Sequence, residues 1–204
     1  MAAPAHDLSG NLQVREFLGF LKFRPKEEYW QLIDGVAVMM DSPTLVHQII
    51  ALNLVSLLEA SFVRKGLNCL ALHEIGVRIP GVAKFLPRPD VAIIPEVLVD
   101  EVYSNRFLLV KEVLSASNTK RLIAHKLRHY KRHPENLYCL VIDSKRPWME
   151  VHPRSRNWEP MRLDEPGGIL ELPEFGLRCT LGDLYRRTPI DLDRSAKQGR
   201  PRSR

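Results

Sequence analysis

The stretch that decides the fold covers residues 106–142, RFLLVKEVLSASNTKRLIAHKLRHYKRHPENLYCLVI. It predicts an apolar strand over residues 106–114, a helix capped by Ser117 or Asn118, and a second apolar strand over residues 137–142. Two strands joined through a helix lie parallel in one sheet, and the helix covers one face of that sheet. The stretch therefore predicts the crossover unit of an α/β fold.

The segments upstream predict two helices and a hairpin. Residues 12–21 carry apolar side chains at helical spacing. Residues 30–40, WQLIDGVAVMM, predict two strands joined at Asp34-Gly35, a dipeptide that tolerates the positive φ of a tight turn. Ser42-Pro43 predicts the start of a long helix to about residue 65, with the serine as N-cap and the proline at the first helical position. This helix is apolar on most sides, so we expect it to be buried against a sheet.

The remaining pattern predicts one domain with a mixed β-sheet flanked by helices. Further strand or turn segments are predicted at residues 69–79, 90–94, 148–152, 169–172 and 177–181. We find no internal repeat and no second domain in the sequence. We therefore expect an N-terminal extension over residues 1–13, a domain over residues 14–190 and a disordered basic tail over residues 191–204.

The positive charge of the chain is concentrated in two places. The 204 residues are 45% hydrophobic and 26% charged, a composition that excludes a disordered or fibrous chain. The net charge is +6. Residues 191–204 hold five basic and two acidic side chains. Residues 113–134 hold six more Lys and Arg and no acidic residue. The rest is slightly acidic, so any anionic partner is expected near residues 113–134 or at the tail.

The cysteines and the N-terminus bear on the compartment. Cys69, Cys139 and Cys179 are far apart and lie among apolar or strand-like residues, which predicts reduced thiols in the core. The first residues lack the basic and apolar regions of a signal peptide, and no run of about 18 apolar residues occurs. We therefore expect a cytoplasmic protein with no membrane segment.

Two carboxylates are candidates for a metal site. Glu112 lies inside an otherwise apolar strand, where an unpaired charge is costly and must be paired, protonated or bound to a metal. Asp90 opens the preceding strand, so both carboxylates can meet at one edge of the sheet and offer the hard oxygen ligands that Mg²⁺ needs. The alternatives are a turn residue for Asp90 and an ion pair with a neighbouring Lys or Arg for Glu112.

Lys126 adds a third candidate. It falls between Leu122 and Tyr130 at i and i+4 spacing, on the helix face that should pack against the sheet. One interpretation is that the side chain extends to the helix edge and into water. The other is that it delivers an ammonium group to the two carboxylates.

The same helix carries histidines at i, i+4 and i+8: His125, His129 and His133, the last near its expected end. This spacing can align imidazoles for zinc, but no Cys or acidic ligand accompanies them in the sequence. The arginines beside them indicate an exposed cationic face that meets phosphates, and this is the interpretation we favour. The predicted phosphate-binding residues are Lys120, Arg121, His125, Arg128 and His129.

Several segments, in their order and spacing, resemble a known family. They are WQLIDGVAVMM, SPTLVHQ, Pro89-Asp90, Glu112-Val113-Leu114-Ser115, HKLRHY, LVIDSKRPWMEVHPR and GGILELPEFGLRCTLGDLY. Together, over about residues 14 to 188, they resemble the Uma family, a large bacterial group of restriction endonucleases within the PD-(D/E)XK nuclease superfamily. No nucleophile elbow, phosphate loop or dinucleotide fingerprint competes with this resemblance.

The resemblance implies a restriction-endonuclease-like core that hydrolyses phosphodiester bonds in DNA and pairs as a homodimer. Asp90, Glu112 and the backbone carbonyl of Val113 would hold Mg²⁺ or Mn²⁺. Leu114 stands where the superfamily lysine is expected, so Lys126 resembles a replacement that has moved to the helix.

Accessory roles and departures from the family pattern complete this expectation. His47, Gln31 and Tyr130 are possible accessory residues, although His47 can equally be a polar residue near the helix cap. Gln31 and Val36 stand where the family often has glutamates, and Leu122 where it often has an aspartate. The alternative function is therefore a catalytically impaired nuclease fold that acts as a nucleic-acid-binding or assembly module.

Overall fold

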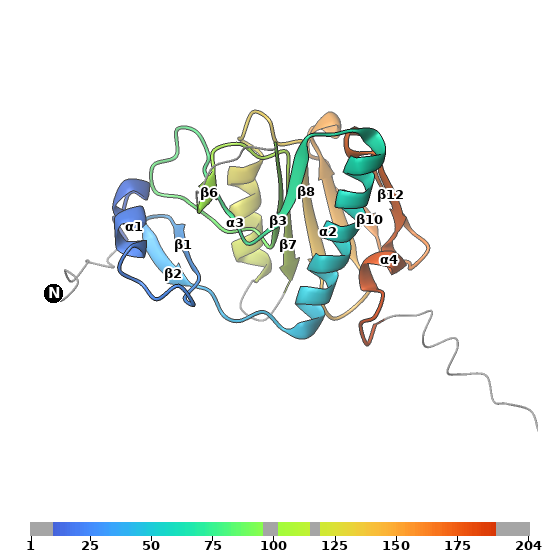
Figure 1. Ribbon diagram of the computed structural model, residues 1–204, viewed down its shortest axis with the longest axis horizontal. Coiled ribbons are helices and arrows are strands. Elements are labelled where there is room, and N and C mark those ends of the chain that lie inside the picture. Colours follow the sequence, from blue (N-terminus) through green and yellow to red (C-terminus); the bar gives the residue numbers. More distant parts are fainter. Residues whose placement is uncertain (1–9, 96–101, 115–118, 191–204) are drawn as a thin grey trace, which may run out of the picture.

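The computed structural model describes residues 10–95, 102–114 and 119–190 (Figure 1). Its helices are α1 Val14–Leu21, α2 Leu45–Lys65, α3 Lys120–Tyr130 and α4 Leu181–Tyr185, with 3₁₀ turns η1 Arg154–Arg156 and η2 Pro173–Phe175. Its first six strands are β1 Trp30–Ile33, β2 Val36–Met39, β3 Cys69–His73, β4 Gly76–Val77, β5 Val91–Pro95 and β6 Tyr103–Ser104. The other six are β7 Leu109–Leu114, β8 Tyr138–Asp143, β9 Met149–Pro153, β10 Met161–Leu163, β11 Ile169–Leu172 and β12 Leu177–Thr180.

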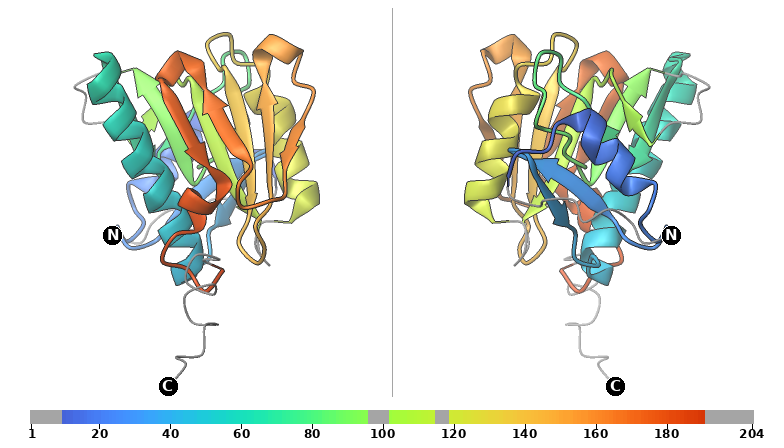
Figure 2. Two further views of the ribbon diagram at one scale, coloured as in Figure 1. Left: turned by 90° about the vertical axis from the view of Figure 1, so that its right-hand side faces the viewer. Right: turned by 90° about the vertical axis from the view of Figure 1, so that its left-hand side faces the viewer.

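A six-stranded mixed sheet forms the centre of the molecule, in the order β10-β9-β8-β7-β5-β3. Strands β7 and β8 pair in parallel and are joined through α3, which confirms the predicted crossover unit. The other neighbours in this sheet pair antiparallel. Figure 2 shows α2 and α3 on opposite faces of the sheet. The two strands that carry the candidate carboxylates therefore lie between two helical layers.

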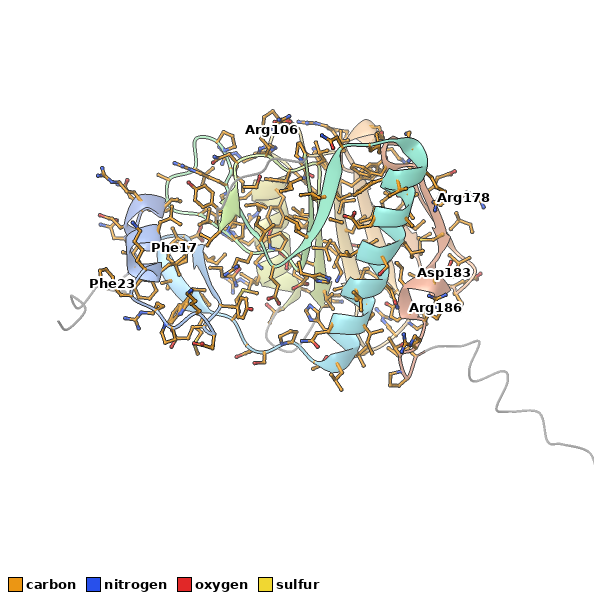
Figure 3. All side chains as sticks on the ribbon, viewed as in Figure 1. Phe17, Phe23, Arg106, Arg178, Asp183 and Arg186 are labelled. Carbon is orange, nitrogen blue, oxygen red and sulfur yellow. The ribbon has the colours of Figure 1, made fainter. Side chains whose placement is uncertain are left out.

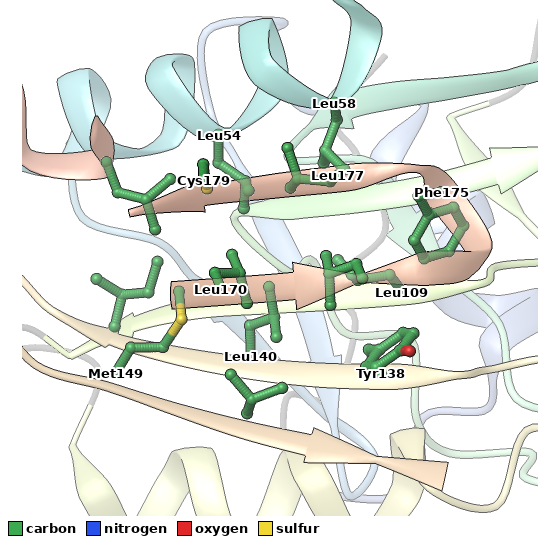
Figure 4. Packing of buried hydrophobic residues seen from close by; sticks show 14 of the residues in the cluster. Leu54, Leu58, Leu109, Tyr138, Leu140, Met149, Leu170, Phe175, Leu177 and Cys179 are labelled. Atoms are coloured by element: carbon green, nitrogen blue, oxygen red, sulfur yellow. The ribbon is translucent and has the colours of Figure 1, made fainter. Parts of the chain in front are cut away.

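The larger core lies on the α2 side. Figure 4 shows Leu54 and Leu58 of α2 pointing toward Leu177 and Cys179 of β12, with the β11–β12 hairpin between α2 and the sheet. α2 is the one described helix long and apolar enough to span a membrane by length and composition. Its buried positions pack on this hairpin and on the sheet, as in the core helix of an α/β domain.

Two details of α2 differ from the prediction. The N-cap is Thr44, whose Oγ1 accepts a hydrogen bond from the His47 amide, so the helix begins after Ser42-Pro43. We expected this helix to be buried, but Leu45 and Leu52 are 76% and 56% exposed. Because apolar residues surround most of this helix, the sequence alone does not select the face that packs.

A smaller N-terminal unit combines α1 with the β1–β2 hairpin. Its turn is the predicted Asp34-Gly35, with φ values of 50° and 82°. A Cβ atom at Gly35 would lie 2.6 Å from the Gly10 carbonyl oxygen, so the turn needs glycine there for space as well as for its φ. Phe17 of α1 is buried, whereas Phe23, beyond the end of α1, is largely exposed (Figure 3).

Three segment boundaries also differ. The strand predicted over residues 69–79 is split into β3 and β4. The crossover helix begins after Thr119, which caps it by accepting from the Leu122 amide, and it ends at Tyr130. The predicted caps Ser117 and Asn118 lie outside the described residues, as do residues 1–9 of the predicted extension and all of the predicted tail.

Candidate active site

Asp90 precedes β5 at the point where that strand meets β7. The antiparallel register pairs Val91 with Lys111, and one further step of this register sets Asp90 opposite Glu112. Side chains directly opposite on antiparallel strands have Cβ atoms about 5 Å apart. Asp90 Oδ2 accepts a hydrogen bond from the Val113 amide, which anchors the carboxylate to β7. The two candidate carboxylates therefore lie on neighbouring strands at one end of the β5–β7 pair.

His47 holds the other oxygen of Asp90. Its Nε2 lies 3.1 Å from Asp90 Oδ1, and because an ionised carboxylate only accepts, Nε2 is the donor. Burial alone would raise the pKa of Asp90, but the His47 hydrogen bond and the charges of Lys111 and Lys126 outweigh burial and lower it. Asp90 is therefore ionised at neutral pH although it is buried.

Glu112 is held from α3. Lys126 Nζ lies 3.1 Å from Glu112 Oε1 and 3.2 Å from Oε2, and the Tyr130 hydroxyl donates to Oε1 at 2.7 Å. Lys126 is 1% exposed, so its side chain points inward and does not extend into water. Burial and the charge of Glu112 raise the pKa of Tyr130 well above its usual value, so the hydroxyl keeps the proton that it donates.

Lys111 lies beside Glu112 in β7, but its side chain leaves the strand on the opposite face. It is fully buried, and its Nζ has no hydrogen-bond partner among the residues the structure describes. Burial lowers the pKa of Lys111 from 10.5 to about 8, although the charges of Asp90 and Glu112 counteract the shift. A second ammonium group therefore lies close to both carboxylates. Sequence reasoning missed it, although a lysine within an apolar strand was a signal as strong as Glu112.

A cleft of about 880 Å³ reaches the Asp90 side of this cluster. Its wall includes the β2 end of the N-terminal hairpin, the start of α2 and the residues that follow β3. The acidic and histidine residues that line it are Glu27, Glu28, Asp41, His47, His73, Glu74 and Asp90. No Lys or Arg lines the cleft within the described residues, so its field attracts cations toward Asp90.

The other predicted site residues are not among those that line this cleft. Gln31 is buried in β1, and its Oε1 has no hydrogen-bond partner in the described part of the chain. Lys120, Arg121 and Arg128 are exposed on α3, so their phosphate-binding role stays a prediction. Val36 is exposed.

Of the three histidines predicted on an exposed cationic face, His133 is buried, whereas His125 and His129 are half-buried, and their phosphate-binding role stays a prediction. His133 is buried with its ring 4.1 Å from that of Phe107, and both ring nitrogens are used, toward the Asn105 carbonyl and the Glu135 amide. His129 stacks on Phe85, and burial together with the neighbouring charges lowers its pKa. Helical spacing predicted one direction for these side chains, but Phe85, Phe107 and the Asp34 turn cover part of that face.

Comparison with known proteins identifies the family of this chain. The Uma2 family model, described as "Putative restriction endonuclease", matches residues 14–182. The chain belongs to this family. A comparison with curated proteins found no match.

A solved structure resembles this Uma2 family chain in fold. It is described as a "putative nuclease belonging to DUF820 from Anabaena variabilis ATCC 29413". The TM-score is 0.64 at 21% sequence identity, over 81% of this chain and 94% of that one. This similarity confirms the restriction-endonuclease-like α/β fold, with its mixed sheet flanked by helices. The Uma2 family in turn indicates a nuclease.

Proposed function

We propose that the protein is a metal-dependent endonuclease that hydrolyses phosphodiester bonds in DNA. The observation that carries this proposal is a pair of buried carboxylates: Glu112 in β7, paired with the Lys126 ammonium, and Asp90, anchored to the Val113 amide of the same strand. Membership of the Uma2 family supports the same chemistry.

The residues present fit a hard divalent cation. Asp90 and Glu112 offer carboxylate oxygens, and the backbone carbonyl of Val113 is the proposed third ligand. The acidic lining of the cleft leads a cation to Asp90, and the low pKa of Asp90 keeps that ligand deprotonated. A divalent ion such as Mg²⁺ or Mn²⁺ held there would polarise the phosphodiester and lower the pKa of the attacking water.

The surrounding side chains supply positioning and charge. Tyr130 and Lys126 fix the orientation of Glu112, and His47 fixes that of Asp90. The Lys126 ammonium also orients the water and offsets the negative charge that grows on the phosphate in the transition state. The exposed Lys120, Arg121 and Arg128 of α3 are the proposed contacts for the DNA backbone.

Two finer expectations belong to this proposal. A cytoplasmic location fits the three free cysteines, of which Cys139 and Cys179 are buried. A homodimer is expected from the family resemblance, and sedimentation of the purified chain tests it.

A nuclease assay with Mg²⁺ or Mn²⁺ tests the site. We expect Asp90→Ala and Lys126→Ala each to lower the cleavage rate by at least about 100-fold, because each removes charge stabilisation from the transition state. Asp164→Ala, which removes an exposed carboxylate, is the matched control and should cut like the wild type. Cleavage that persists in both site variants would contradict the assignment of the site.

One observation favours the alternative, a nuclease fold that binds nucleic acid without cutting it. The buried Lys111 ammonium lies near both carboxylates and competes electrostatically with a metal ion. That reading predicts DNA binding that weakens steeply with salt and no cleavage by the wild type with either metal. Cleavage by the wild type excludes it.

A further inference from the structure

A second polar cluster joins the N-terminal hairpin to α3. Asp34 comes from the turn between β1 and β2, and His125 and His129 lie one helical turn apart on α3. One ligand atom from each of the three side chains lies within 4.8 Å of the other two. His125 Nε2 is 2.9 Å from Asp34 Oδ2 and 3.1 Å from Oδ1. The sequence offered no acidic ligand beside these histidines, and the fold brings one from about ninety residues away.

One ring nitrogen of His129 has no hydrogen-bond partner among the described residues. Its ring stacks on Phe85 at 4.1 Å between centroids and meets the His125 ring edge-on at 5.1 Å. Its Nδ1 is buried and has no hydrogen-bond partner in the described ranges. A buried imidazole nitrogen without a partner is costly, and metal coordination at the ring is one of the few ways to use it.

The donor set differs from that of the candidate active site. Two imidazoles and one carboxylate suit zinc and similar transition metals, whereas carboxylate and carbonyl oxygens suit Mg²⁺. His125 and His129 flank Lys126 in sequence, but they face the hairpin turn while Lys126 faces Glu112. The cluster therefore stands apart from the proposed nuclease chemistry.

We propose that Asp34, His125 and His129 form a binding site for one transition-metal ion of the zinc class. Three protein ligands leave a fourth position for water or another donor. The ion would tie the β1–β2 turn to α3, the helix that carries Lys126. This proposal does not rest on the proposed nuclease function.

Arg128 sets the affinity of this site. Its Nη2 lies 3.0 Å from His125 Nδ1, and because a guanidinium only donates, Nδ1 accepts and Nε2 carries the proton in the metal-free protein. When a metal binds Nε2, the ring proton must lie on Nδ1. Nδ1 then needs a hydrogen-bond acceptor, but the Arg128 guanidinium is also a donor. Arg128 must move when the ion binds. A glutamine at this position would provide an acceptor, so Arg128→Gln should tighten zinc binding about tenfold.

Calorimetric titration of the full chain with Zn²⁺ tests the proposal. It is done in an Asp90→Asn background, so that ions at the candidate active site do not contribute. We expect one ion per chain, and Co²⁺ in its place should give the visible absorption of a site with nitrogen ligands. Binding should weaken at least about 100-fold in Asp34→Asn and in His129→Gln.

The controls keep the outcome clear. Asp34→Asn leaves the fold testable, because the side chain is exposed and asparagine tolerates the positive φ of the turn. Asp164→Ala removes an exposed carboxylate that is not part of the cluster and should bind Zn²⁺ like the parent. Absence of binding, or binding that is unchanged in both ligand variants, would overturn the proposal. Loss of nuclease activity in Asp90→Asn with zinc binding intact would separate this site from the proposed active site.

Discussion

Helix α3 carries two polar clusters that differ in burial and in donor chemistry. Lys126 and Tyr130 hold Glu112 inside the protein, where all three side chains are almost fully buried. One residue earlier along the helix in each case, His125 and His129 face Asp34, whose side chain is 61% exposed. The two clusters therefore lie about 100° apart around the axis of one helix. One is buried and rich in oxygen ligands, and the other is partly exposed and rich in nitrogen ligands. The polar atoms lie about equally close together in both clusters, but breaking a contact costs more free energy of unfolding in the buried cluster.

The largest effect is expected where the charge is buried. Glu112→Gln leaves the Lys126 ammonium buried without its counter-charge, so the free energy of unfolding should fall by about 3–5 kcal/mol. Urea denaturation measures this change. The matched control is Glu135→Gln, which breaks the exposed pair with Arg106 and should cost less than about 1 kcal/mol. The double variant Glu112→Leu with Lys126→Met should recover most of the loss, and a failure to recover would show that the pair is not the source of the cost.

Metal ions should stabilise the two clusters selectively. Free Zn²⁺ at about 100 times its Kd should raise the free energy of unfolding by about 2.7 kcal/mol through Asp34, His125 and His129. Thermal unfolding of Asp34→Asn should lose the zinc effect and keep any effect of Mg²⁺. Asp90→Asn should show the reverse. Loss of both effects in either variant would mean that the clusters are not independent.

Lys111, on the opposite face of β7, should make the stability of the buried region depend on pH. Its pKa in the folded protein is about 8 against 10.5 ordinarily, so between these values the unfolded chain holds a proton that the folded chain has lost. Stability should therefore rise with pH from about 8 to 10.5, and the full cost of the buried charge is present below pH 8. Lys111→Met should remove this pH dependence and raise the free energy of unfolding at pH 7 by roughly 1–3 kcal/mol. Denaturant titrations at pH 7 and pH 10 check both statements, and an unchanged pH dependence would contradict them.

The smallest effect belongs to the exposed contact. Without a metal, the coupling free energy between Asp34 and His125 in a double-mutant cycle of Asp34→Asn and His125→Gln should be about 0.2–1 kcal/mol. It should also shrink in high salt, because solvent and ions screen this contact. A coupling free energy as large as that between Glu112 and Lys126 would show that solvent screens the Asp34–His125 contact less than the exposure of the turn indicates.

Local patterns predicted much of the fold. The apolar runs on either side of α3 identified β7 and β8. They also identified the parallel pairing, because two strands joined through a helix in one sheet pair in parallel. Asp34-Gly35 identified the hairpin turn, because few dipeptides accept two positive φ values. The sequence did not indicate which face of α2 packs, because this helix is apolar nearly all round.

Part of the candidate site was also predicted from local sequence patterns. A carboxylate and a lysine placed among apolar residues stand out against their surroundings, and this drew attention to Glu112 and Lys126. Lys111 is equally unusual within an apolar strand, and we did not predict it. The ion pair of Lys126 with Glu112 needs the helix to pack on the strand, and spacing alone left two directions for the side chain.

The sequence by itself determined the elements, the crossover topology and the family, because these depend on periodicity and on short segments in a fixed order. Only the tertiary structure decided which polar side chains meet. His47 reaches Asp90 and Asp34 reaches His125 across long stretches of chain, and Gln31 and His133 are held elsewhere. The physical reason is that burial and pairing of a charge depend on neighbours brought together by packing, and no local pattern encodes their distance.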